Sequence, residues 1–179
     1  MVENYTKGEC MEDEYITSPM FTEKEYIRLY RYVIKPRVSQ SMLLTFFLMC
    51  CITDLTIDEL VCLNWSDFDF KNRVLHIRCR YSSSPCNCVR DYLLSNTLVD
   101  LLQDVKNYME IRLRPTMCIY DNYSPVICTN FGAPYSELAL KNKWDRFTYK
   151  AICKQTYFED LRYVYEDSLY NMGLYAQLI

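Results

Sequence analysis

The stretch that decides the fold runs from Leu43 to Phe70 and reads LLTFFLMCCITDLTIDELVCLNWSDFDF. Residues 42–52 are almost all apolar, but this run is too short to span a bilayer, which takes about 20 residues. We therefore expect a helix that is buried on all sides in a globular core. Thr56 then begins a capping box with Glu59, in which each side chain bonds a backbone N–H at the start of a helix. The pattern predicts a second helix directly after Thr56, with Glu59 facing water.

The remaining elements follow from helical spacing, N-cap residues and turn formers. The turn 64–67 closes the second helix, and residues 74–79 and 89–94 read as two strands of a hairpin across a polar loop. Further elements are predicted as a first helix from Thr22 to Pro36, helices 97–112 and 137–152 capped by Ser95-Asn96 and Ser136, a short strand at Val126-Ile127, a helix from Phe158 to Gly173, and a final turn 174–179. The predicted fold is mainly α with a small antiparallel β-sheet, of the α+β class.

The composition is that of an ordinary globular protein with unusual cysteine and tyrosine counts. The 179 residues suggest one domain, since half are hydrophobic and 24% are charged. Ten cysteines could suggest a disulfide framework, but Cys50, Cys51 and Cys62 lie in apolar helical runs, where a free thiol packs as a small hydrophobe. With no secretory signal in view, we expect a reduced, intracellular and cytoplasmic protein.

Charge is distributed unevenly along the chain. The net charge is −3, and residues 1–18 carry five carboxylates against one lysine, a balance of −4. Residues 19–179 are therefore nearly neutral, at about +1. We expect 1–18 to be a flexible acidic arm and 19–179 to be the folded domain. A near-neutral domain argues against strong DNA binding, which normally needs a concentration of Lys and Arg.

The order of these motifs resembles the catalytic domain of the tyrosine recombinases, the phage integrase family. In that family a buried helix ends in a Thr-Gly-Leu-Arg corner, followed by Ile-x-Glu-Leu and then Trp-x-Asp-(Ile/Phe)-Asp. The matching segments here are Thr53-Asp54-Leu55-Thr56, Ile57-Asp58-Glu59-Leu60, Trp65-Ser66-Asp67-Phe68-Asp69, the turn Gly132-Ala133-Pro134-Tyr135-Ser136, and Phe158-Glu159-Asp160-Leu161-Arg162-Tyr163. The resemblance covers about residues 20–179 and implies the family's catalytic core, cut short at its C-terminus before the segment with the nucleophile.

The resemblance also implies altered chemistry. The family uses two Arg side chains to grip the scissile phosphate, a Lys and His residues to move protons, and a Tyr near the C-terminus to attack phosphorus. Thr56 stands at the first Arg position and suits an N-cap, while Glu159 stands at a His position, where a carboxylate would repel phosphate oxygens. Arg162 keeps the second Arg position. We therefore predict a pseudoenzyme with no catalytic residue.

Several basic residues are candidate nucleic-acid contacts. Arg162 is either a remaining phosphate contact or a partner for a nearby Glu at helical spacing. Arg80 lies in the hairpin, near the family's Lys position. A basic stripe follows the predicted helix 137–152 and consists of Lys143, Arg146, Lys150 and Lys154. This stripe reads equally well as a DNA-backbone contact or as a solvated face.

A metal site is the weaker reading of the hairpin. His76, Cys79, Cys86 and Cys88 could be zinc ligands, but their spacing is irregular, and His76 and Cys79 fall on opposite faces of a strand. An ordinary hairpin with free thiols is favoured, so neither a metal nor a cofactor is expected.

Two functional hypotheses remain open. In the first, a non-catalytic integrase-like protein of a mobile element binds and blocks or regulates a protein partner, such as a host nuclease or a related recombinase, through some of its 17 tyrosines. In the second, the chain is a DNA-binding regulator that occupies recombinase-like sites without cutting. An active recombinase that borrows its Tyr from another chain is disfavoured by Thr56 and Glu159.

Overall fold

The computed structural model describes residues 21–52, 54–78, 89–115, 120–163 and 176–178. The elements, in chain order, are α1 (Glu23–Val33), α2 (Gln40–Cys51), α3 (Ile57–Cys62), the 3-10 turn η1 (Trp65–Asp67), β1 (Phe68–Asp69), β2 (Val74–Arg78), β3 (Val89–Leu94), α4 (Asn96–Leu113), α5 (Glu137–Ile152), the 3-10 turn η2 (Phe158–Tyr163) and β4 (Ala176–Leu178). The predicted mainly α fold with a small antiparallel sheet is confirmed.

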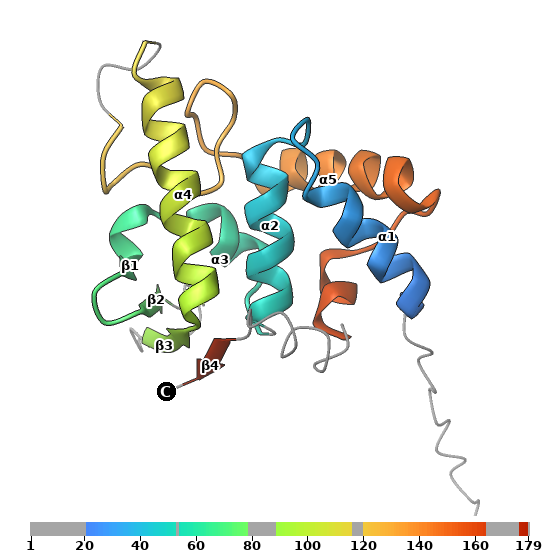
Figure 1. Ribbon diagram of the computed structural model, residues 1–179, viewed down its shortest axis with the longest axis horizontal. Coiled ribbons are helices and arrows are strands. Elements are labelled where there is room, and N and C mark those ends of the chain that lie inside the picture. The colour runs from blue at the N-terminus through green and yellow to red at the C-terminus, as the bar shows by residue number, and fades with distance from the viewer. Residues whose placement is uncertain (1–20, 53, 79–88, 116–119, 164–175, 179) are drawn as a thin grey trace, which may run out of the picture.

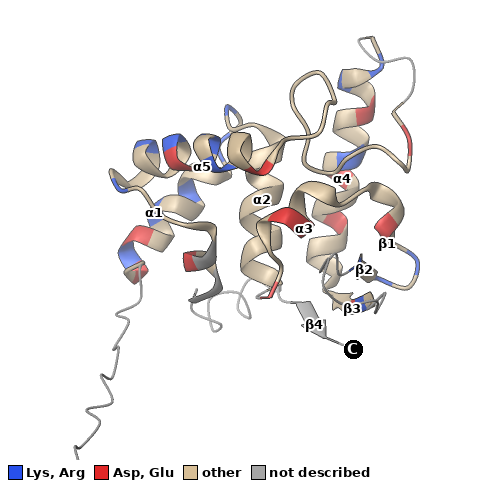
Figure 2. Ribbon diagram, turned by 180° about the vertical axis from the view of Figure 1, so that it is seen from behind, with Lys and Arg blue, Asp and Glu red and all other residues tan. Residues whose placement is uncertain are grey.

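Helix α2 lies at the centre of the fold. Ten of its twelve residues are buried, which confirms that it is covered on all sides. In Figure 1, α4 and the sheet lie on one side of α2, while α1 and α5 lie on the other, and the reverse view in Figure 2 agrees. On the α1 side, Tyr26 stacks on Phe46 of α2 with ring centroids 5.9 Å apart. The apolar circumference of α2 thus sets where every other element can pack.

The sheet is an antiparallel meander in the order β1-β2-β3-β4. The predicted hairpin is confirmed, with Leu75 opposite Tyr92 and His76 opposite Asp91. Strand β4 pairs with β3, with Ala176 opposite Leu94, so the prediction of a final turn over 174–179 is wrong for 176–178. A strand of three residues has too little alternation to be recognised in a sequence, because only its pairing with β3 defines it.

The two long helices begin where their caps predict. The Ser95 side chain accepts from the Leu98 N–H at 3.2 Å, and Ser136 accepts from Ala139 at the same distance. The first helix likewise begins after Thr22, with Glu25 completing a capping box. These short-range bonds satisfy N–H groups that the helix itself leaves open, which is why the starts were readable from the sequence.

Two predicted elements take a different form. Val126 and Ile127 are buried but form no strand, and they lie between two isolated bridges, Asn64 to Pro125 and Cys128 to Pro134. The segment that begins at Phe158 starts as the 3-10 turn η2 and not as an α-helix. Phe158 anchors this turn by stacking on Trp144, with ring centroids 4.9 Å apart. The rest of that predicted helix and the acidic arm 1–18 lie outside the described residues.

Within the described part of the chain, no helix has the length and apolarity needed to cross a membrane. The cysteines in this part, Cys50, Cys51, Cys62, Cys128 and Cys153, form no disulfide with one another. Their surroundings differ, because Cys50 and Cys51 are buried in α2 while Cys153 is exposed just after α5. Burial raises the pKa of the Cys51 thiol to about 12 and that of Cys50 well above its ordinary range.

We predict that iodoacetamide at pH 8 modifies Cys153 long before Cys50 or Cys51 in the folded protein, because the thiolate is the reacting species. Peptide mass spectrometry over a time course measures the three rates, and the same series in 6 M guanidinium is the control in which they should converge. Equal native rates for Cys153 and Cys50 would contradict the buried position of α2.

Candidate functional site

The first candidate site is the N-terminus of α3, where the resemblance places a phosphate-gripping Arg. Thr56 and Glu59 form the predicted capping box, and the Thr56 N–H donates to Glu59 Oε2 at 3.0 Å. The prediction that Glu59 faces water is wrong, since its side chain is only 3% exposed. A carboxylate buried this deeply needs a cation or several donors close by.

Arg90 of β3 supplies that cation. Its Nη2 donates to both carboxylate oxygens of Glu59 at 2.6 Å each. Its Nη1 donates to the carboxylate of Asp54 and to the Asp54 backbone carbonyl, the latter at 3.3 Å. Tyr92, two residues along β3, donates its hydroxyl to the other oxygen of Asp54. Strand alternation explains this grouping, because residues 90 and 92 project from the same face of β3.

The charges of this cluster, Asp54, Glu59, Arg90 and Tyr92, leave no cation for an incoming phosphate. Burial acts to lower the pKa of Arg90, but the hydrogen bonds and charge of Glu59 outweigh it, so the pKa is raised and the guanidinium stays charged. Burial, and then the hydrogen bond to Asp54, raise the pKa of Tyr92, so its hydroxyl remains a donor. Two carboxylates share one guanidinium, and the net local charge is therefore negative.

Sequence reasoning missed Arg90 and Asp54 as members of this cluster. One signal was present: Tyr92 is an aromatic residue on a strand that borders the core, and Arg90 shares its face. The sequence does not show that β3 lies next to α3, because only the folded chain brings these two elements together.

The other family-derived positions are less fully described. Glu159 and Arg162 both lie on η2, but the structure describes neither side chain, so the choice between a phosphate contact and an ion pair for Arg162 stays a prediction. Arg80 lies in 79–88, outside the described residues.

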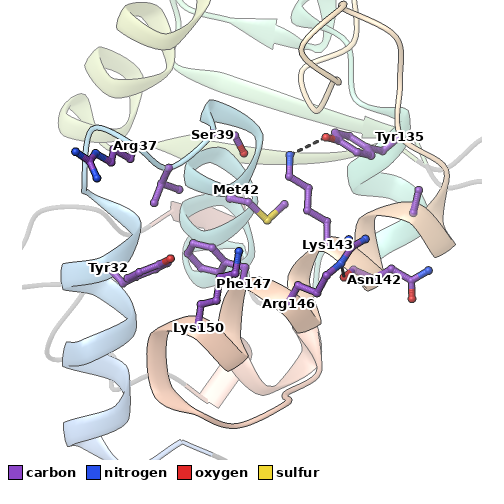
Figure 3. A pocket seen from close by; sticks show the side chains of 12 residues that line it. Tyr32, Arg37, Ser39, Met42, Tyr135, Asn142, Lys143, Arg146, Phe147 and Lys150 are labelled. Atoms are coloured by element: carbon purple, nitrogen blue, oxygen red, sulfur yellow. Dashed lines mark hydrogen bonds between the residues drawn. The ribbon is translucent and has the colours of Figure 1, made fainter.

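The second candidate site is a cavity of about 630 Å³ between α1, α2 and α5. Lys143, Arg146 and Lys150 of the predicted stripe line it, together with Arg37 from the α1–α2 connection. Figure 3 shows Lys143 extending along the cavity to the Tyr135 hydroxyl, to which it donates at 2.6 Å. Figure 2 shows how Lys and Arg recur along α5, beside α1. The structure therefore gathers three of the four stripe residues with a cation that the sequence had not linked to them.

Lys154, the fourth residue of the stripe, is placed differently. Its Nζ lies 3.6 Å from Glu25 of α1, and it does not line the cavity. The hydrogen bonds from Thr22, and with them the charge of Lys154, lower the pKa of Glu25. Lys154 therefore helps to join α5 to the first turn of α1.

The hairpin candidate for a metal is only partly described. His76 Nδ1 lies 2.7 Å from Asp91 Oδ1 on the neighbouring strand, which gives this histidine an ordinary cross-strand partner. Cys79, Cys86 and Cys88 lie outside the described residues. Among the residues that the structure does describe, no group of three or more His, Cys, Asp or Glu side chains could hold a metal ion. That the protein binds no metal stays a prediction.

Comparisons with known proteins bear on the fold. No protein-family model and no curated protein matches the chain. Its structure is similar to that of XerA recombinase, with a TM-score of 0.58, 20% identity, and coverage of 86% of this chain and 51% of that one. It is also similar to the Tn1549 transposon integrase in complex with transposon right end DNA, with a TM-score of 0.59, 21% identity, and coverage of 87% and 54%.

This chain thus spans about half the length of the structures it matches. The likeness shows a tyrosine recombinase-like fold, as the sequence motifs predicted. At this identity it shows the fold alone, and function must be argued from the sites.

We predict that R90A lowers the free energy of unfolding by about 3 kcal/mol, because it leaves the Glu59 carboxylate buried without its cation. The matched control is R114A, which removes an exposed ion pair with Glu110 on α4 and should cost less than about 0.5 kcal/mol. Urea denaturation of both variants and the parent measures the difference. Similar losses for R90A and R114A would show that the cluster does not stabilise this end of the fold.

Proposed function

We propose that this chain is a non-catalytic protein with a tyrosine recombinase-like fold that acts by binding a protein partner and blocking or regulating it. A host nuclease and a related recombinase are the two partner classes that suit a product of a mobile element. The shared fold of a transposon integrase supports such an origin.

The observation that carries the loss of catalysis is the commitment of Arg90 to Asp54 and Glu59 beside Thr56. Phosphoryl transfer depends on preorganised cations and donors aimed at the charge that develops on the phosphate oxygens. A phosphate placed against α3 would instead meet one guanidinium already bound by two carboxylates. Threonine has neither the charge nor the reach to replace an Arg clamp.

Exposed aromatic side chains support a protein partner. Buried aromatic anchors carry most of the energy in many protein interfaces. In the described part of the chain, the exposed aromatic residues are Tyr108, Tyr123, Phe131, Tyr149 and Tyr157. Tyr123 is the most open of them, with 79% of its surface accessible. Burial of such side chains against a partner would be favourable, because it removes apolar surface from water.

The cations of the α1–α2–α5 cavity favour a second candidate, a DNA-binding regulator that does not cut. Lys and Arg contacts to phosphates position a protein on DNA without reading its sequence. Lys143, Arg146 and Lys150 lie on one helix and could follow a backbone, but three contacts give only weak binding at physiological salt.

We predict no covalent protein–DNA adduct on suicide substrates that carry varied recombination sites, because the site beside Thr56 lacks a phosphate clamp. Denaturing gels of labelled DNA provide the measurement, and an active tyrosine recombinase on its own site is the positive control. An adduct from this chain at any site would refute the non-catalytic proposal.

We predict that duplex DNA binds with a dissociation constant of about 10⁻⁴ to 10⁻⁶ M or weaker, with a slope of log affinity against log salt near −3. The variant K143Q/R146Q/K150Q should remove this binding and leave partner capture intact, while Y123A/F131A should do the reverse. Gel-shift titrations and pull-downs from the native host measure the two effects. Nanomolar, sequence-selective DNA binding would favour the second candidate.

A further inference from the structure

The α1–α2–α5 cavity is positively charged without compensation from the described residues that line it. Four cations line it, Arg37, Lys143, Arg146 and Lys150, and no carboxylate does. Two of them make side-chain hydrogen bonds to uncharged groups: Lys143 donates to the Tyr135 hydroxyl, and Arg146 Nε donates to the Asn142 backbone carbonyl at 3.0 Å. None of the four forms an ion pair with a described residue. An anionic ligand is the natural complement of such a cavity.

The N-terminus of α2 adds to this preference. Ser39, the N-cap of α2, lines the cavity and makes no side-chain capping bond, and the first turn of α2 contains no acidic residue. The Ser39 hydroxyl oxygen is buried and has no hydrogen-bond partner among the described residues. The partial positive charge of a helix N-terminus therefore acts on the same space as the four cations.

The chain itself contains a segment of matching charge. Residues 1–18 carry a net charge of −4, and four of their five carboxylates fall within residues 9–14. The number of negative charges within residues 9–14 thus equals the number of cations that line the cavity. The segment also contains Tyr5 and Tyr15, which are suited to a cavity lined by Tyr32 and Phe147.

The position of α1 makes the contact reachable. The segment joins the described chain at Phe21, just before α1, and the cavity lies at the other end of this eleven-residue helix, about 16 Å away. Residues 9–14 precede Phe21 by seven to twelve positions, which an extended chain covers with about 23 to 40 Å. The start of α1 is also tied to the end of α5 by the Glu25–Lys154 pair, so the helix that carries three of the four cations ends beside the point where the segment joins.

We propose that the α1–α2–α5 cavity is a binding site for acidic polypeptide, and that residues 1–18 of this chain occupy it. The contact is intramolecular, so its effective concentration is in the millimolar range even though each exposed ion pair is weak. An acidic or phosphate-bearing ligand must then displace the segment before it reaches the four cations. The segment acts as a built-in competitor, whether or not the chain has the function proposed above.

Zero-length carbodiimide cross-linking of the full chain tests the contact, because it joins only carboxylates and amines that touch. At low salt we expect peptides that link residues 1–18 to Lys143 or Lys150, and we expect them to disappear at 0.5 M NaCl. Lys71 is the matched control: it is an exposed lysine in the turn between β1 and β2, and these strands lie on the other side of α2 from α5 (Figure 1). Links to Lys71 as frequent as links to Lys143 and Lys150 would overturn the proposal.

A binding experiment tests the competition. The probe is a fluorescent decamer of glutamate, and the variants are E9Q/E12Q/D13N/E14Q, K143Q/R146Q/K150Q and the control K71Q. We expect the first variant to bind the probe about tenfold more tightly than the parent, the second to lose binding, and K71Q to match the parent. The first variant leaves every described residue unchanged, so it keeps the test valid if the cavity variant does not fold. Equal affinity of the parent and the first variant would refute occupation of the cavity by residues 1–18.

Duplex DNA is the second probe in the same titration. If the segment occupies the cavity, neutralising it should tighten DNA binding by a similar factor. The acidic-polypeptide site would be overturned by two results together: equal DNA affinity of the parent and the first variant, and no binding of the glutamate probe. Neither result depends on a protein partner, so failure of this inference and failure of the proposed function are distinguishable.

Discussion

Helix α2 is apolar around its whole circumference, and a helix of that kind is stable in water only if other elements cover every side of it. The sheet with α4 covers one side, and α1 with α5 covers the other (Figure 1). Both sides are therefore taken, and the two ends of α2 differ: Cys50, Cys51 and Ile52 at the C-terminal end are buried, while Ser39 and Gln40 at the N-terminal end are partly exposed. The two candidate sites lie at those two ends. The Arg90 cluster lies beyond the C-terminal end of α2, because Asp54 and Thr56 follow that end in the chain. The basic cavity lies at the N-terminal end, where Ser39 lines it.

The Arg90 cluster shows how the burial of one charge fixes the role of another. A buried ion pair contributes little net stability compared with apolar packing, but losing one partner is costly because the other stays buried. Once Glu59 is buried in the capping box of α3, a cation at Arg90 stabilises the folded state. A guanidinium held by two carboxylates is poorly placed to grip a phosphate. In this fold the charge of Arg90 therefore serves stability.

Local rules predicted much of this structure, and long-range contacts account for the rest. The caps at Ser95 and Ser136 were readable because the bonds they make span only three residues. The burial of Glu59 was missed because its partner Arg90 is 31 positions away, and a capping-box carboxylate normally faces water. Strand β4 was missed because its partner strand lies more than 80 positions earlier in the chain. The basic stripe was visible as a pattern on α5, but Arg37 joins it only through the packing of α1 against α5.

At each end of α2 the nearby side-chain charges have the same sign as the pole of the helix. They therefore attract anions at the N-terminal end and repel them at the C-terminal end. Four cations and the positive helix N-terminus act together at the cavity, about 18 Å along the axis from the C-terminal end. At that C-terminal end, the negative pole of the helix and the carboxylates of Asp54 and Glu59 outweigh Arg90. An anionic group that approaches this protein is therefore favoured at the cavity and disfavoured at the Arg90 cluster. Attraction and repulsion of anions are thus separated here along the length of one helix.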